Sequence, residues 1–174
     1  MSDENGQCCC SKGRDGGCAE QNKSQCGNGG CSGGCQNRVI YINEAERDFL
    51  MKLSQIPFLP LARFIMRSSK SDHMESVALS PVYMQDINES IDTVKKTGAV
   101  LQSLEDKYLI TLDYDMPLQN GGYALFEESA LYRQFCDMVH EGGKQDGFLF
   151  DLPVLERGSI ALTTLGQDAV DSLE

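Results

Sequence analysis

Large hydrophobic side chains are absent from the start of the chain and regularly spaced in the rest. Apart from Met1, residues 1–36 contain no Val, Ile, Leu, Met, Phe or Tyr. Such a segment cannot bury enough apolar surface to offset the entropy lost on ordering, so we expect a flexible tail. Residues 37–174 hold the remaining large hydrophobic side chains and have the length of one domain.

The most regular pattern lies between residues 86 and 107. Its hydrophobic or small residues recur every three or four positions, which predicts an amphipathic helix with Gly98 at a close contact. The same spacing predicts helices at 43–56, 58–66, 129–141 and 163–173. Asn43 and Glu46 form a capping-box pattern at the first of these, and Pro57 ends it. In the helix at 129–141 we expect Leu131, Phe135, Met138 and Val139 to point inward.

Shorter apolar runs predict the strands. Residues 77–83 are expected to be extended after a polar loop at 68–75. Residues 108–114 and 123–127 flank turn residues, which predicts a β-hairpin. Residues 144–158 are expected to be mostly loop, followed by a strand at 159–162. Helices and antiparallel strands together predict an α+β domain.

Charge and composition exclude several classes of protein. The net charge is −11, and residues 37–174 account for most of it with 12 basic and 22 acidic side chains. This balance argues against broad nonspecific binding to phosphate. No stretch reaches about 18 consecutive apolar residues, so we expect no membrane span. Residue 1 is not followed by an apolar signal segment, which favours a cytoplasmic protein.

Seven of the eight cysteines fall within the first 35 residues. Clustered thiolates are suited to zinc, copper(I) or an iron–sulfur cluster, and the surrounding glycines let the backbone curl around an ion. Their spacing matches no zinc-ribbon or ferredoxin pattern. Reversibly oxidised thiols and a targeting or partner-binding tail therefore remain alternatives. The candidate metal ligands are Cys8, Cys9, Cys10, Cys18, Cys26, Cys31 and Cys35. The eighth, Cys136, is expected to pack in the core.

Residues 87–127 resemble the second half of a winged helix-turn-helix domain of MarR-like type. The resemblance rests on the helix at 86–107, on Glu105-Asp-Lys-Tyr-Leu-Ile110 and on Gln119-Asn-Gly-Gly122 as the tip of a wing. Ala161-Leu-Thr-Thr-Leu-Gly166 is similar to the motif that opens a closing helix in that family. The resemblance implies a winged-helix-like domain with a small antiparallel hairpin, dimers formed through terminal helices, and DNA as a ligand.

In that family the third helix enters the major groove and the wing contacts phosphates. The candidate DNA-binding residues would be Asn88, Ser90, Thr93, Lys95, Lys96 and Gln102. Protein contact by the same fold and a solvated amphipathic helix remain alternatives, because the wing carries no basic residue.

No pattern of an active site is present, so we expect no enzyme. Neither histidine has a metal-binding partner by spacing, and no P-loop or nucleophile elbow occurs. The first hypothesis is a winged-helix transcriptional regulator whose tail senses a soft metal, an iron–sulfur cluster or redox state. The second is an acidic adaptor that binds a protein partner and carries the metal or cluster without binding DNA.

Overall fold

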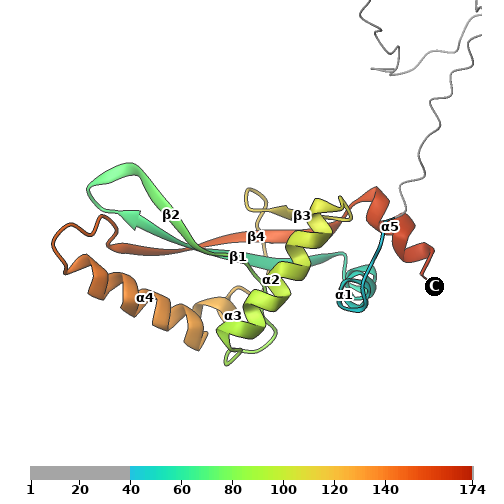
Figure 1. Cartoon of the computed structure of the whole chain (residues 1–174), viewed down its shortest axis with the longest axis horizontal. Coiled ribbons are helices and arrows are strands. Elements are labelled where there is room, and N and C mark those ends of the chain that lie inside the picture. The colour runs from blue at the N-terminus through green and yellow to red at the C-terminus, as the bar shows by residue number, and fades with distance from the viewer. Residues whose placement is uncertain (1–39, 174) are drawn as a thin grey trace, which may run out of the picture. The chain divides into compact units, whose positions relative to one another are not determined.

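The computed structural model describes residues 40–173, so every candidate cysteine ligand lies outside the described residues. The chain divides into two units, 1–39 and 40–174. The second unit combines helices with one antiparallel sheet (Figure 1), which confirms the α+β prediction.

The sheet has four strands in the order β2-β1-β4-β3. They are β1 (Phe58–Ser68), β2 (Ser71–Val82), β3 (Ile110–Asp113) and β4 (Leu152–Leu162). Strands β1 and β4 form the long centre and pair from Phe58 opposite Ala161 to Arg67 opposite Leu152. The expected strand at 159–162 is therefore only the last third of β4, and the expected loop at 144–158 is wrong from Leu152 onward.

The prediction of a helix at 58–66 is wrong, because this segment is the central strand β1. Pro60 is compatible with a helix start. A proline is also tolerated on a side of a strand that has no neighbouring strand, because no backbone hydrogen bond from its nitrogen is needed there. Strand β2 pairs with β1 only as far as Ala62, so one side of β1 is free at Pro60. Burial on both faces then gives β1 a nearly continuous apolar pattern, which periodicity alone cannot distinguish from a helix.

The expected loop at 68–75 is also mostly wrong. Only Ser69 and Lys70 form the turn, and β2 begins at Ser71. The side chains from Asp72 to Glu75 are exposed, so this half of the strand has a polar sequence without the alternation of a half-buried strand.

The helices are α1 (Glu44–Gln55), α2 (Ile91–Asp106), α3 (Ala124–Glu127), α4 (Ala130–Gly143) and α5 (Thr164–Asp171). Four of them confirm predicted helices, but α2 begins at Ile91 and not at residue 86 as predicted. Each of these four starts with a side-chain cap that accepts a hydrogen bond from a backbone N–H in the first turn. The caps are Asn43, Ser90, Ser129 and Thr163. The predicted capping box of Asn43 and Glu46 is present in full.

The predicted hairpin at 108–127 does not form. Residues 124–127 are the short helix α3, and β3 pairs with β4. Tyr123 anchors α3 from within the core: its Oη donates to the carbonyl of Gly158 at 2.5 Å and accepts from the N–H of Leu118 at 2.9 Å. In the sequence, an aromatic residue buried in the core looks the same as an aromatic residue of a strand, which explains why residues 123–127 were predicted as a strand. The winged-helix assignment is therefore not confirmed.

Two hydrophobic cores lie along the sheet. At the α1/α5 end, side chains of α1, α2 and α5 pack on the near ends of β1, β3 and β4; the members include Leu50, Leu101, Leu104, Ile160 and Val170. At the α4 end, α4 packs against β4 and β1, and side chains of α2, α3 and the end of β2 complete the core; the members include Phe64, Val82, Val94, Phe135 and Val139. The predicted close contact at Gly98 is confirmed, because a Cβ there would lie 2.9 Å from the carbonyl oxygen of Pro81.

Candidate functional site

An apolar groove of about 220 Å³ lies at the α4 end, and we call it the α4 groove. Its walls come from one face of α4, from the first turns of α2 and from β2. The lining residues are Phe64, Ala78, Leu79, Ile91, Lys95, Leu131, Gln134, Phe135 and Met138. Leu131, Gln134, Phe135 and Met138 follow the spacing of a single helical stripe, and Ile91 and Lys95 lie one turn apart on α2.

A β-bulge in β2 shapes one wall of the groove. Phe64 pairs with Leu79 and Ile65 pairs with Val77, so Ala78 is an extra residue with no partner on β1. Successive residues of a regular strand point to opposite faces, but a bulge changes the direction of a side chain. Ala78 and Leu79 consequently both line the groove.

The rim of the groove exposes large apolar side chains. Met138 is 59% exposed and Ile91 is 44% exposed. The prediction that Met138 points inward is therefore wrong, although Leu131, Phe135 and Val139 are buried as expected. The sheet covers only part of the apolar stripe of α4. The outer edge of this stripe has no partner within residues 40–173. A stripe of this kind is typical of a surface that binds another protein.

The charged residue that lines the groove is Lys95, whose side chain is exposed and forms none of the ion pairs found in residues 40–173. Half of the other Lys and Arg residues in this part of the chain form ion pairs. Five of the eleven Lys and Arg residues in this part of the chain form ion pairs with carboxylates, namely Arg63, Arg67, Lys107, Lys144 and Arg157. This leaves six Lys and Arg side chains of residues 40–173, Lys95 among them, outside these ion pairs.

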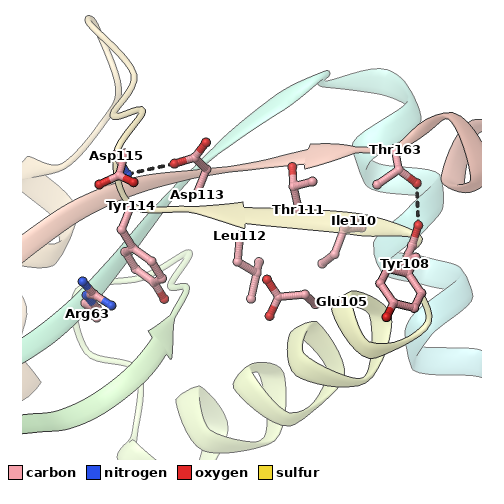
Figure 2. Close-up of a pocket in the computed structure, with 10 residues that line it drawn as sticks. All are labelled: Arg63, Glu105, Tyr108, Ile110, Thr111, Leu112, Asp113, Tyr114, Asp115 and Thr163. Atoms are coloured by element: carbon pink, nitrogen blue, oxygen red, sulfur yellow. Dashed lines mark hydrogen bonds between the residues drawn. The ribbon is translucent and has the colours of Figure 1, made fainter. Parts of the chain in front are cut away.

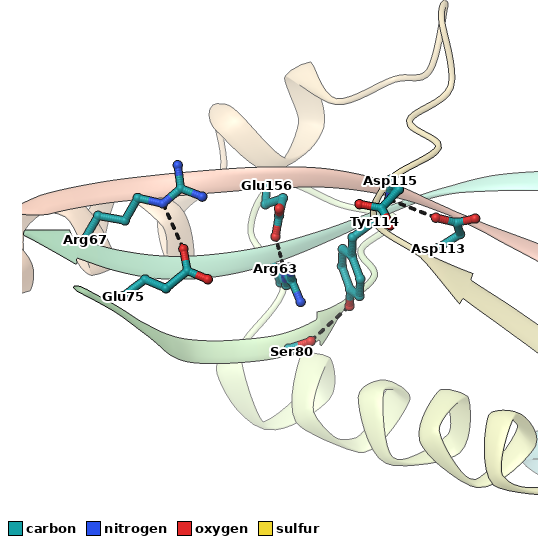
Figure 3. Close-up of polar contacts among 8 residues, drawn as sticks. All are labelled: Arg63, Arg67, Glu75, Ser80, Asp113, Tyr114, Asp115 and Glu156. Carbon is teal, nitrogen blue, oxygen red and sulfur yellow. Dashed lines mark hydrogen bonds and ion pairs between the residues drawn. The ribbon is translucent and has the colours of Figure 1, made fainter. Parts of the chain in front are cut away.

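The sheet face opposite α4 carries two of these ion pairs (Figure 3). Arg67 pairs with Glu75 at 3.1 Å across β1 and β2, and Arg63 pairs with Glu156 across β1 and β4. The hydrogen bond to Glu156 raises the pKa of Arg63 above its usual value. Charges that are satisfied within the sheet contribute little to the recognition of a partner.

A second and more open groove of about 560 Å³ runs along β3 (Figure 2). At one end the guanidinium of Arg63 lies 4.3 Å from the centre of the Tyr114 ring. Tyr114 Oη shares a hydrogen bond of 2.9 Å with Ser80 Oγ, and burial raises the pKa of this tyrosine. Because Arg63 is paired and Tyr114 remains protonated at neutral pH, neither of these two side chains is an evident acid–base group.

The expected DNA-binding residues do not form one continuous polar face. Ser90 is the cap of α2 and Thr93 bonds to it, while the amide of Gln102 donates to Glu105 and Asp106. Lys95 lines the α4 groove, whereas Lys96 lines a separate hollow beside α1. The last of the set, Asn88, lies before α2, and its backbone N–H bonds to Asp86.

Neither metal nor thiolate chemistry is evident in the described part of the chain. Residues 40–173 contain no group of three or more His, Cys, Asp or Glu side chains that could hold a metal ion. Cys136 is partly buried and packs against the α4-end core. Burial raises the pKa of its thiol, so this cysteine is protonated at neutral pH and poorly reactive. None of the helices in residues 40–173 is long and apolar enough to cross a membrane.

Comparison with known proteins gives little further information. No protein-family model matches the chain, and no curated protein matches it. One solved structure is similar: an uncharacterized protein from the hydrocarbon-degrading marine bacterium Alcanivorax borkumensis SK2. It is 12% identical, the match covers 78% of this chain and 87% of that one, and the TM-score is 0.42.

Sequence reasoning did not find the α4 groove. The only signal was the spacing of Leu131, Phe135 and Met138, which we interpreted as a fully inward face. The exposure of Met138 depends on how α4 lies on the sheet, and the bulge at Ala78 has no distinctive sequence pattern.

Proposed function

We propose that this chain is an adaptor: residues 40–173 bind a protein partner, and the Cys-rich segment binds a soft metal ion or an iron–sulfur cluster. The observation that carries the first part is the α4 groove, whose rim exposes Ile91 and Met138 beside the unpaired Lys95. Exposed apolar side chains that gather around a groove beside a charged residue are typical of protein-binding surfaces.

A protein partner fits the charge of this domain better than DNA does. A DNA-binding surface presents clustered Lys and Arg side chains to the phosphates. In residues 40–173 five of the eleven cations are paired with carboxylates, and Lys95 and Lys96 line different hollows. The volume of the α4 groove also lies below the roughly 300–1,000 Å³ typical of small-molecule sites.

The binding part of the proposal is tested with two variants that match in chemistry. Ile91 and Leu165 are 44% and 43% exposed, and each lies in the first turn of a helix. Ile91→Glu places a carboxylate on the rim of the α4 groove, whereas Leu165→Glu places one on α5. The full chain and both variants are used to recover partners from a lysate of the source cells, and affinities are then measured with the purified partner.

We expect a protein that binds the full chain and Leu165→Glu equally but binds Ile91→Glu at least about tenfold more weakly, because a carboxylate must lose its hydration in the groove. The same three proteins are incubated with a pool of random DNA duplexes at low salt. Specific retention of DNA would contradict the adaptor function. Partner binding of unchanged affinity in both variants would contradict it as well.

The metal part of the proposal rests on the seven cysteines of residues 1–36 and is tested separately. The full chain is purified without oxygen and studied by absorption spectroscopy and metal analysis. A bound copper, zinc or iron content that disappears when the seven cysteines are replaced by serine supports it. A colourless, metal-free protein from cells grown without oxygen is evidence against it.

A further inference from the structure

The α4 groove also indicates what kind of segment it binds. We infer that the partner contributes a short amphipathic helix whose apolar side chains enter the α4 groove and whose acidic side chain pairs with Lys95. This inference rests on the proposed protein-binding function and specifies the chemistry of the partner.

The shape of the groove favours a helix over an added strand. Two walls are helical stripes, one on α4 and one on α2, and such stripes pack against the ridges of a third helix. The third wall is β2, which is bulged at Ala78. A strand added there would meet an interrupted row of backbone donors and acceptors. A helix satisfies its own backbone and needs only apolar contacts, so the bulge does not hinder it.

The side chains that line the α4 groove determine which residues the bound helix must carry. Phe64, Leu131 and Phe135 form the buried floor, and Ile91 and Met138 form the exposed rim. Apolar anchors one and two turns apart on the incoming helix would match this arrangement. Methionine adapts to different apolar partners, which suits its position at the entrance.

The charge of Lys95 predicts an acidic residue on the bound helix. Lys95 lies one turn after Ile91, on the same side of α2, and its ammonium forms none of the ion pairs in residues 40–173. A carboxylate on the polar side of the bound helix can reach it. A second copy of this chain is the competing occupant of the groove, and its binding would appear as a concentration-dependent dimer.

The test uses a phage library of random peptides of about 16 residues, selected on the full chain under reducing conditions. Parallel selections use Ile91→Glu, Leu165→Glu and the charge reversal Lys95→Glu. We expect peptides with apolar residues spaced three or four apart and an acidic residue at a constant distance from them. They should be recovered equally on Leu165→Glu and at least about tenfold less on Ile91→Glu. On Lys95→Glu, Lys or Arg should replace the acidic residue.

Two further measurements complete the test. Circular dichroism of the selected peptides should show a gain of helix on binding, and sedimentation should show the full chain as a monomer. Alternating or Pro-rich peptides, no change on Lys95→Glu, no enrichment at all, or a dimer dissociated by Ile91→Glu would overturn the inference. If peptides depend on Ile91 but are not helical, the helix is wrong while the protein-binding function stands. If nothing depends on Ile91, both are wrong.

Discussion

The two ends of the sheet differ in how completely their hydrophobic side chains are buried. At the α1/α5 end three helices close over the core, and even a carboxylate is buried there. Glu46 is fully buried and accepts hydrogen bonds from Lys107, Ser103 and its own capping residue Asn43. At the α4 end, α4, α3 and the start of α2 pack against the sheet (Figure 1). An apolar groove remains open there between α4, α2 and β2.

Under the proposed function, this difference would separate stability from binding within one small domain. A buried carboxylate with all its hydrogen bonds fixes the relative position of α1 and α2 and rigidifies that end. An open groove contributes little to stability, because its rim remains in contact with water. In the proposed adaptor, the α1/α5 end would serve mainly as a scaffold, and the α4 end would provide the binding surface.

The largest expected effect compares one apolar truncation at each end. Leu101 is fully buried in the α1/α5 core, so Leu101→Ala should lower the free energy of unfolding by about 3 kcal/mol. Met138 is 59% exposed, so Met138→Ala should change it by less than about 0.5 kcal/mol. Urea unfolding followed by circular dichroism measures both. Equal losses would remove the distinction between the two ends.

The next prediction compares an ion pair at each end. Lys107 forms an ion pair with the buried Glu46, and Lys107→Met leaves that carboxylate without its cation. We expect the free energy of unfolding to fall by about 2–3 kcal/mol. Lys144 and Glu141 are about 70% exposed at the end of α4, so Lys144→Met should cost no more than about 0.5 kcal/mol. The same urea unfolding measures both variants, and a smaller loss for Lys107→Met than for Lys144→Met would argue against a rigid α1/α5 end.

Acid should weaken the α1/α5 end through the same carboxylate. Burial alone would raise the pKa of Glu46, but its hydrogen bonds to Lys107, Ser103 and the Asn43 backbone outweigh burial and lower it. A carboxyl group whose pKa is lower in the folded than in the unfolded state stabilises the protein at pH values above the unfolded-state pKa. This stabilisation is lost as the pH falls through the folded-state pKa. The stability difference between the natural chain and Glu46→Gln should therefore shrink from pH 7 toward pH 3. A difference that does not change with pH would show that Glu46 contributes through packing alone.

The smallest expected effect is a gain of stability beside the β3 groove. Tyr108 follows α2 with φ of 60°, a left-handed conformation that glycine adopts without strain. The N–H of Tyr108 bonds to Glu105 and that of Leu109 bonds to Leu104, which completes the usual turn after a helix. Tyr108→Gly should raise the free energy of unfolding by about 0.5–1 kcal/mol, because the exposed ring is not needed for packing. Thermal unfolding checks this, and a loss would reveal a contact of the ring that matters for the fold.

The same comparison explains what the sequence could predict. The helices α1, α2, α4 and α5 were predictable because their caps and their three- or four-residue spacing are local. Strand β1 and the Tyr123 segment were not, because a strand buried on both faces and an aromatic anchor depend on partners far along the chain. The residues of the α1/α5 core could be predicted from their spacing. The α4 groove could not, because it depends on how α4, α2 and β2 come together in space.

The most direct test of the α4 groove as a protein-binding surface is photo-crosslinking in the source cells. A photoreactive amino acid replaces Met138 on the groove rim or, as the control, Leu165 on α5; both positions are exposed. We predict that position 138 cross-links to one protein through an apolar segment that mass spectrometry can identify, and that position 165 does not. The same products from both positions, or none from position 138, would contradict the account.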